Sequence, residues 1–143
     1  MISFLEQLPP NFGMFDLFAK VKDRTPFIIV CLQECERMNI LLSEIRKSLN
    51  DLDAGLKGQL NITDAMESLS EALNLNKVSP DWEKWAYFSK KALVEWFADL
   101  LLRIEQLTLW GEEMVTPKVL WISGLFNPMS YLTAIMQNTS REH

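Results

Sequence analysis

The sequence predicts a mainly α-helical, elongated domain with one long amphipathic helix, several shorter helices and one short extended segment near the C-terminus. Apolar residues recur every three or four positions in two long windows, which is the spacing of a helix face packed against a core. Thr25-Pro26, Ser79-Pro80 and Asn127-Pro128 are helix-start pairs, because each joins a good N-cap residue to a proline. A sequence of 143 residues with 48% hydrophobic content is long enough to bury one core.

The first segment, residues 1–24, is expected to hold one short helix. Pro9-Pro10 interrupts regular structure and Gly13 follows it. After this break, Met14–Lys22 has helical spacing.

The long helix is expected to begin at Thr25-Pro26 and to continue for about eight turns. Gly55 and Gly58 should end it, since glycine is favoured just past a helix C-terminus. Its apolar positions recur about every 3.5 residues and define a narrow buried seam. The seam consists of Ile28, Leu32, Cys35, Met38, Leu42, Ile45, Leu49, Leu52 and Leu56.

Three more helical pieces are expected in the middle of the sequence. Thr63-Asp64 should open the first, with its aspartate and Glu67 spaced as a capping pair. Ser79-Pro80 should open a short piece that carries two tryptophans. A third, longer helix should run over residues 89–110, with Gly111 just past its end.

The last part of the sequence should change from an extended segment to a helix. Val119–Ile122 is a β-type apolar run, and Gly124 follows it. Asn127-Pro128 then opens a helix. The apolar positions of this final helix are Tyr131, Leu132, Ile135 and Met136.

The composition argues against nucleic-acid and membrane partners. Net charge is −5 and the longest basic runs are pairs such as Arg46-Lys47, so no stripe of cations could follow phosphates. No stretch approaches the roughly 18 uncharged apolar residues of a membrane span. The opening residues lack the basic start of a signal peptide. Cys31 and Cys35, four apart on a helix, are expected as two buried thiols of a reducing compartment.

We expect no catalytic residue, no cofactor and no metal, and therefore no enzyme activity in this segment. Residues 55–58 are too short for a phosphate-binding loop and follow a helix. The only histidine is His143, the last residue, so no Ser-His or Cys-His pair can form inside a fold. The carboxylates should lie in turns or on helix faces opposite the seam: Glu34, Glu36, Glu44, Asp51, Asp53, Glu112 and Glu113.

Aromatic residues are concentrated in the second half of the sequence. At helical spacing they are usually core residues, the interpretation we favour for Trp96 and Trp121. Aromatic side chains are also enriched at interfaces. The candidate interface residues on this ground are Trp82, Trp85, Trp121 and Phe126.

Two blocks of the sequence resemble a known family. Val119–Gln137 reads VLWISGLFNPMSYLTAIMQ and resembles the WLSGFFNPQ-FLTA-Q block near the C-terminal end of dynein heavy chains. Leu32–Leu49 resembles the QECERMN-L-EIR-SL block of axonemal dynein heavy chains. Because residues 56–58, the stretch around Met66-Glu67 and residues 96–100 follow the family pattern as well, the resemblance covers nearly the whole sequence.

The resemblance implies a position after the sixth AAA+ module of a heavy chain. Residues 1–25 would connect from the last AAA+ module, and residues 26–143 would be the helical part of the C-terminal domain, a fragment whose β-rich part is missing. The implied role is non-catalytic: the segment would brace the AAA+ motor ring during ATP-driven, microtubule-based movement of cilia or flagella. The ATP sites would lie upstream, so the resemblance carries over no cofactor or catalytic residue.

The implied partner is the AAA+ ring of the same heavy chain. Other dynein subunits and microtubules would be reached only through the parent complex, in the cytoplasm and cytoskeleton, at the axoneme of a cilium or flagellum. Two alternatives stay open: a free-standing helical adaptor that docks into a partner groove, and a small helical hydrolase with paired carboxylates. If the missing β-rich part normally covers Val119–Phe126, the isolated segment should expose an apolar patch there and self-associate.

Overall fold

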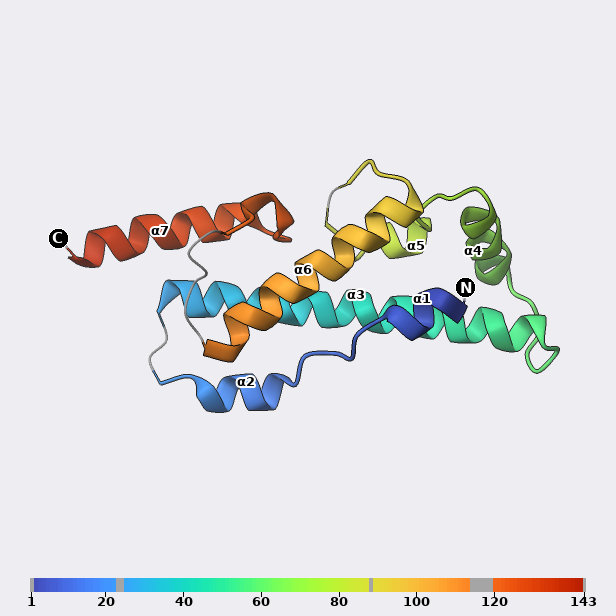
Figure 1. Ribbon diagram of the computed structural model, residues 1–143, viewed down its shortest axis with the longest axis horizontal. Helices are drawn as coiled ribbons and strands as arrows, with labels where there is room; N and C mark the ends of the chain where they lie inside the picture. Colours follow the sequence, from blue (N-terminus) through green and yellow to red (C-terminus); the bar gives the residue numbers. More distant parts are fainter. Residues whose placement is uncertain (1, 23–24, 88, 114–119, 143) are drawn as a thin grey trace. The chain divides into compact units, whose positions relative to one another are not determined.

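The computed structural model describes residues 2–22, 25–87, 89–113 and 120–142. These residues form seven α-helices and one 3-10 turn and contain no strand, which confirms the predicted mainly α-helical class (Figure 1). The elements are α1 (Ile2–Gln7), α2 (Met14–Lys20), α3 (Pro26–Leu56), α4 (Asp64–Asn74), α5 (Pro80–Glu83), α6 (Leu93–Glu113), the 3-10 turn η1 (Ile122–Gly124) and α7 (Pro128–Glu142).

The protein forms two compact units that alternate along the sequence. Unit 1 comprises residues 1–11 and 40–101, and unit 2 comprises residues 12–39 and 102–143. The long helices α3 and α6 each contribute residues to both units. Residues 1–25, expected as one connecting segment, are likewise divided between the two units.

Helix α3 begins where the sequence predicts and buries the predicted seam. Thr25 Oγ1 accepts a hydrogen bond from Ile28 N at 3.3 Å, which satisfies one of the unpaired amides of the first turn. Every seam residue from Leu32 to Leu52 is buried, whereas Leu56 is 63% exposed. The spacing of about 3.5 residues therefore identifies the buried face over most of the helix.

Glycine ends α3 through a left-handed residue. Gly58 has a φ of +78°, a conformation that costs an L-residue free energy and glycine none. Gly58 N donates to Gly55 O at 3.1 Å, and Gln59 N donates to Ala54 O at 2.9 Å. These two bonds are those of a Schellman motif, so Gly58 ends the helix while Gly55 lies inside its last turn.

Polar side chains of α3 hold the segment between α1 and α2. In unit 2, the Asn39 side chain accepts a hydrogen bond from Phe12 N at 2.7 Å and donates one to Phe12 O at 3.0 Å. In unit 1, Arg46 donates to Pro9 O at 2.7 Å and to Asn11 Oδ1 at 2.9 Å. Backbone groups that have no helical partner at the proline break are thus satisfied by side chains.

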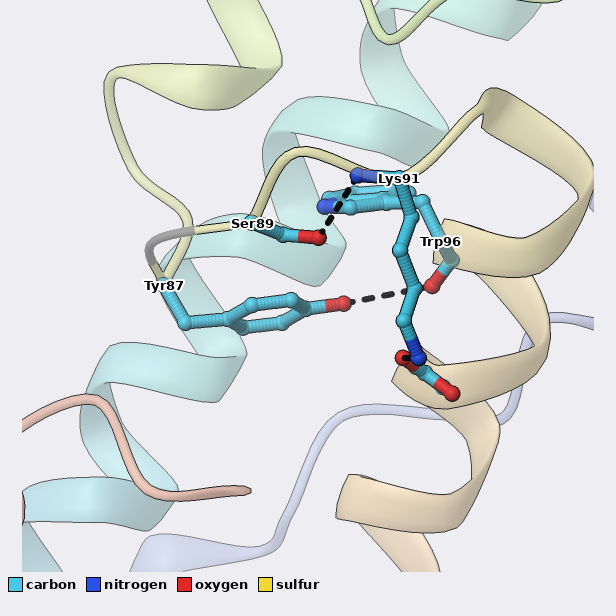
Figure 2. Close-up of polar contacts among 5 residues, drawn as sticks. Tyr87, Ser89, Lys91 and Trp96 are labelled. Carbon is cyan, nitrogen blue, oxygen red and sulfur yellow. Dashed lines mark hydrogen bonds and ion pairs between the residues drawn. The ribbon is translucent and has the colours of Figure 1, made fainter. Parts of the chain in front are cut away.

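The core of unit 1 surrounds Trp96 of α6. This side chain is 1% exposed, which confirms the prediction that Trp96 is a core residue. The Tyr87 ring lies 5.7 Å from the Trp96 ring, and the Tyr87 hydroxyl donates to Trp96 O at 3.3 Å (Figure 2). The neighbouring Phe97 ring lies 4.7 Å from the ring of Phe4 in α1. Aromatic pairs at such distances stabilise a core beyond the area that they bury.

Helix α6 begins at Leu93, later than the predicted start at Ser89. Ser89 Oγ accepts a hydrogen bond from Lys91 N at 3.2 Å, and the Lys91 ammonium pairs with the Asp99 carboxylate (Figure 2). Asn76 caps the helix instead: its carbonyl accepts from Leu93 N at 3.0 Å, and its Oδ1 accepts from the next amide at 3.1 Å. Because the capping residue comes from a distant part of the sequence, local sequence does not reveal this start.

The prediction that Gly111 lies past the end of α6 is wrong. Helix α6 continues to Glu113, and Gly111 is buried inside it. A Cβ at Gly111 would stand 3.1 Å from Leu17 Cδ2 of α2. The absent side chain therefore makes room for close packing within unit 2, and glycine here does not end the helix.

The predicted capping pair of Asp64 and Glu67 is also wrong. Thr63 is the N-cap of α4, and its Oγ1 accepts a hydrogen bond from Met66 N at 3.2 Å. Glu67 lies one residue beyond the position that a capping box requires. Both acidic residues lie in the first turn, where their negative charges interact favourably with the positive end of the helix dipole.

Asn76 ends α4 and caps α6 at once. Its φ is +54°, in the left-handed region that asparagine tolerates better than most residues. Asn76 N donates to Leu73 O at 3.3 Å, and Lys77 N donates to Ala72 O at 2.9 Å, which forms a second Schellman motif. One short polar residue thus joins two helices of unit 1.

Substitutions at Asn76 should separate these two roles. The Asn76→Gly variant keeps the left-handed backbone and loses the Oδ1 acceptor and its hydrogen bond, so its free energy of unfolding should fall by about 1 kcal/mol. The Asn76→Ala variant loses the acceptor and also forces alanine into that backbone, which should cost about 1 kcal/mol more. Urea unfolding of both variants beside the wild type measures the two losses, and equal losses would contradict the role of the backbone conformation.

Candidate functional site

The two candidate tryptophans of unit 1 have different surroundings. Trp82 is 1% exposed; its Nε1 donates to Ser48 Oγ at 2.8 Å, and its ring stacks 5.9 Å from the Trp96 ring. Trp85 is 50% exposed. Trp82 is therefore a core residue that offers almost no surface, whereas Trp85 has the exposure that an interface residue needs.

The other two candidates, Trp121 and Phe126, precede α7 in unit 2. Trp121 has the extended backbone predicted for the apolar run, whereas Ile122, the last residue of that run, begins η1 instead; the backbone is extended again at Leu125. Val119, the first residue of the predicted apolar run, lies outside the described residues. A Cβ at Gly124 would stand 2.5 Å from the indole of Trp121, so the turn that brings the indole back over the backbone requires glycine.

Two side chains of α6 contact Trp121: Gln106 binds its backbone, and Arg103 lies over its ring. Trp121 N donates to Gln106 Oε1 at 2.8 Å, and Gln106 Nε2 donates to Trp121 O at 3.3 Å. The Arg103 guanidinium lies over the indole, 4.7 Å from the ring centroid, in a cation–π contact. Trp121 is half-buried, so it combines a fixed position with partial exposure.

A buried carboxylate fixes the backbone at the start of α7. Glu34 of α3 is 2% exposed, and it accepts hydrogen bonds from Phe126 N at 2.7 Å and Asn127 N at 2.9 Å. We name this arrangement the Glu34 clamp. Asn127 Oδ1 in turn accepts from Ser130 N at 3.2 Å, as an N-cap does, which confirms the predicted helix start. The carboxylate therefore lies near the positive end of the α7 dipole, where negative charge is favoured.

Burial raises the pKa of Glu34 above its ordinary value of 4.5, and desolvation is the largest influence. The hydrogen bonds from Asn127 and Phe126 act in the opposite direction, as do the positive charges of Arg37 and Arg103. The net direction of the pKa shift is upward because removing a carboxylate from water costs more than these partners recover.

The expectation that Glu34 lies opposite the seam is wrong. Glu34 follows Cys31 by three residues and precedes Met38 by four, so it shares the helical face of these buried residues. An acidic residue at a seam position is the sequence signal that indicates a buried, partnered carboxylate. Arg103, 5% exposed on α6, is a second important residue that sequence reasoning missed. The other described carboxylates of that set are exposed or half-buried: Glu36, Glu44, Asp51, Asp53 and Glu112.

Helix α7 buries one face and exposes another. Tyr131 is buried, and its ring lies 6.0 Å from the Trp110 ring and 5.7 Å from the Phe27 ring. On the exposed side, Met129 is 67% and Met136 is 69% exposed. Leu125 is buried and Trp121 is half-buried, so these two residues of the preceding segment are covered more than the two methionines.

The two cysteines lie in the core of unit 2 as free, buried thiols, as predicted. A side-chain hydrogen bond with Cys31 and burial raise the pKa of the Cys35 thiol. Within the described ranges, no group of three or more His, Cys, Asp or Glu side chains is arranged to hold a metal ion. No helix among those residues is long and apolar enough to cross a membrane.

A family model for the C-terminal domain of the dynein heavy chain matches residues 1–143, the full length of this sequence. The protein belongs to this family.

Its relatives are dynein heavy chains. It is 52% identical over 139 residues to a ciliary dynein beta chain of Tripneustes gratilla and 50% identical over 139 residues to dynein axonemal heavy chain 11 of Sus scrofa. It is 46% identical over 142 residues to the flagellar outer arm dynein beta chain of Chlamydomonas reinhardtii. Each similarity covers 97% of this sequence and 3% of the relative, so the protein spans a small part of the length of these heavy chains.

In this dynein C-terminal domain, the two sequence blocks that resemble the family meet at the Glu34 clamp. Glu34 is the first glutamate of the QECERMN block, and Phe126 and Asn127 belong to the FNP part of the later block. The carboxylate thus joins backbone amides 92 and 93 residues away in the sequence. The two blocks therefore contact each other in the folded protein, in addition to following one another in the sequence as they do in the family.

The pH dependence of stability tests the environment of Glu34. Because its folded pKa is raised, folding favours the protonated carboxyl; its contribution to stability is greatest below pH 4.5 and is lost as pH rises through the raised folded pKa. The free energy of unfolding of the wild type minus that of Glu34→Gln should therefore fall as pH increases over this window. Urea unfolding at a series of pH values measures the difference.

The matched control is Glu36→Gln, which removes a carboxylate from an exposed position on the same helix. A difference between wild type and Glu34→Gln that grows with pH would contradict the account. That result would mean that Arg37, Arg103 and the two amides outweigh the desolvation of Glu34.

Proposed function

We propose that this protein is a non-catalytic structural and regulatory segment of an axonemal dynein heavy chain that braces the AAA+ motor ring. Family membership supports its place within a heavy chain. The names of the relatives, which are axonemal, ciliary and flagellar dynein chains, support a place in the axoneme of a cilium or flagellum. The same membership supports a heavy-chain segment over a free-standing helical adaptor.

The Glu34 clamp is the observation that carries the bracing role. A brace has to transmit force between its elements without local slippage, which requires contacts that fix elements distant in sequence. The clamp does this with two short hydrogen bonds to a buried carboxylate, and such charge-assisted bonds are about twice as strong as neutral ones. Breaking them would leave two amides without partners and a buried carboxylate without these hydrogen bonds, which is costly.

We further propose how the segment is placed in its parent protein. Residues 1–25 would connect from the last AAA+ module, and residues 26–143 would form the helical part of the C-terminal domain, which a β-rich part would complete. ATP would be bound and hydrolysed in other regions of the heavy chain, and microtubules and other dynein subunits would be contacted only through the parent complex.

The residues that contact the ring would be Trp85 in unit 1 and, separately, Trp121 and Phe126 in unit 2. Trp85 is 50% exposed, while Trp121 and Phe126 are half-buried, and their backbone amides are held by Gln106 and Glu34. Aromatic residues that are held in place before binding lose little conformational entropy at an interface. Trp82, as a core residue, would support Trp85 from within and make no direct contact.

A heavy-chain motor that carries Glu34→Ala in this segment tests the proposal. The rate of ATP hydrolysis should stay near that of the wild type, because the proposed ATP sites lie elsewhere. Microtubule gliding velocity should fall severalfold, because a loosened brace would transmit less of each ATP-driven rearrangement. The matched control is Glu36→Ala, an exposed position on the same helix. An unchanged gliding velocity for Glu34→Ala, or an equal loss of hydrolysis and gliding, would contradict the bracing role.

A further inference from the structure

An apolar groove lies in unit 1 between the end of α3 and α4. Its volume is about 500 Å³, and apolar atoms form most of its lining. Three of its lining side chains are strongly exposed: Leu56 at 63%, Ile62 at 47% and Leu75 at 54%. Large aliphatic side chains that gather around one depression at such exposure indicate a binding surface. We name this depression the α3–α4 groove.

Glycine at position 55 shapes the floor of the groove. A Cβ at Gly55 would stand 2.8 Å from Ile62 Cδ1 and 3.1 Å from Met66 Sδ, closer than ordinary contact. The missing side chain thus allows Ile62 and Met66 to pack directly on α3. Met66 is almost fully buried, so the floor is formed before any partner binds.

The α4 wall of the groove carries only negative charge. Glu67 and Glu71 line the groove one turn apart and are exposed, and Asp64 lies in the first turn of the same helix. The sequence has no lysine or arginine from Gly58 to Asn76. Within the described ranges neither glutamate forms an ion pair. Both carboxylates are therefore available to cations of a partner.

We propose that the α3–α4 groove binds a basic amphipathic α-helix of a partner polypeptide. Apolar anchors at helical spacing would pack on Leu56, Ile62 and Leu75, in the manner of helix-in-groove recognition. Lysine or arginine beside these anchors would pair with Glu67 and Glu71. The α4 wall has 11 residues and is therefore about 16 Å long, which matches about three turns of a docked helix.

Charge also argues against a second copy of this protein as the occupant. Helix α7, which exposes Met129 and Met136, has no lysine or arginine from Pro128 to Ser140. It would bring apolar anchors to the groove without cations for Glu67 and Glu71. The inference is independent of the bracing role, because it concerns a different surface and is tested by binding alone.

Two labelled model peptides of about 18 residues, long enough to form stable helices, test the proposal on the full-length segment. One has leucines on one helical face and lysines elsewhere, and the other has glutamate in place of every lysine. Fluorescence anisotropy measures their binding. The basic peptide should bind about tenfold more tightly than the acidic peptide, since two attractive pairs replace two repulsive ones.

Three variants locate the binding. Ile62→Ser with Leu75→Ser should weaken the basic peptide about tenfold through lost apolar contact. Glu67→Lys with Glu71→Lys should reverse the preference between the two peptides. Glu95→Lys with Glu105→Lys changes the net charge by the same amount at exposed positions on α6, so it controls for general attraction of a basic peptide to an acidic protein.

Three outcomes would overturn the proposal. Equal binding of both peptides would show that the groove selects no charge. Equal effects of the α4 and α6 charge variants would show attraction to the whole protein and not to the groove. Concentration-dependent dimerisation that Ile62→Ser with Leu75→Ser abolishes, seen by sedimentation, would make a second copy the occupant. Circular dichroism confirms that each variant retains its helices.

Discussion

The Glu34 clamp is the interaction on which the organisation of unit 2 depends. The segment from Trp121 to Asn127 has only one short 3-10 turn and no strand partner among the described residues, so its backbone groups need partners from elsewhere. Glu34 supplies two of them, and Gln106 supplies two more at Trp121. Helix α7 can begin at Pro128 because the residues immediately before it are already fixed.

The same physical solution recurs in unit 1 and at two further positions of α3. Asn76 caps α6, and Asn39 and Arg46 pin the proline-containing segment between α1 and α2. In each case a polar side chain from one element forms the hydrogen bond to a backbone group that a neighbouring strand would form in a sheet. Such contacts contribute about 1 kcal/mol each when neutral and more when charged, so several of them can decide the path of a backbone that has few other restraints. The described residues, which contain no strand, therefore keep well-defined connections through such side-chain contacts.

The sequence predicts the helices better than their tertiary roles. Thr25, Asn127 and Gly58 act within a few residues of their own position, so local chemistry predicts the beginning of α3, the beginning of α7 and the end of α3. Gly111 could not be interpreted locally, because the reason for glycine there is the close approach of Leu17. Glu34 and Asn76 act on amides far away in the sequence, and burial of Trp82 depends on the neighbouring Trp96. Of the four candidate interface residues, the sequence could name the aromatic residues but could not show which of them pack inside the unit.

Hydrogen exchange at the amides of Phe126 and Asn127 tests the central claim most directly. If the Glu34 clamp fixes the start of α7, both amides should be protected in the wild type and should exchange much faster in Glu34→Ala. The Trp121 amide, which donates its hydrogen bond to Gln106, should keep its protection in the same variant. Unchanged exchange at Phe126 and Asn127 in Glu34→Ala would contradict the account, as would an equal loss of protection at Trp121 and throughout the protein.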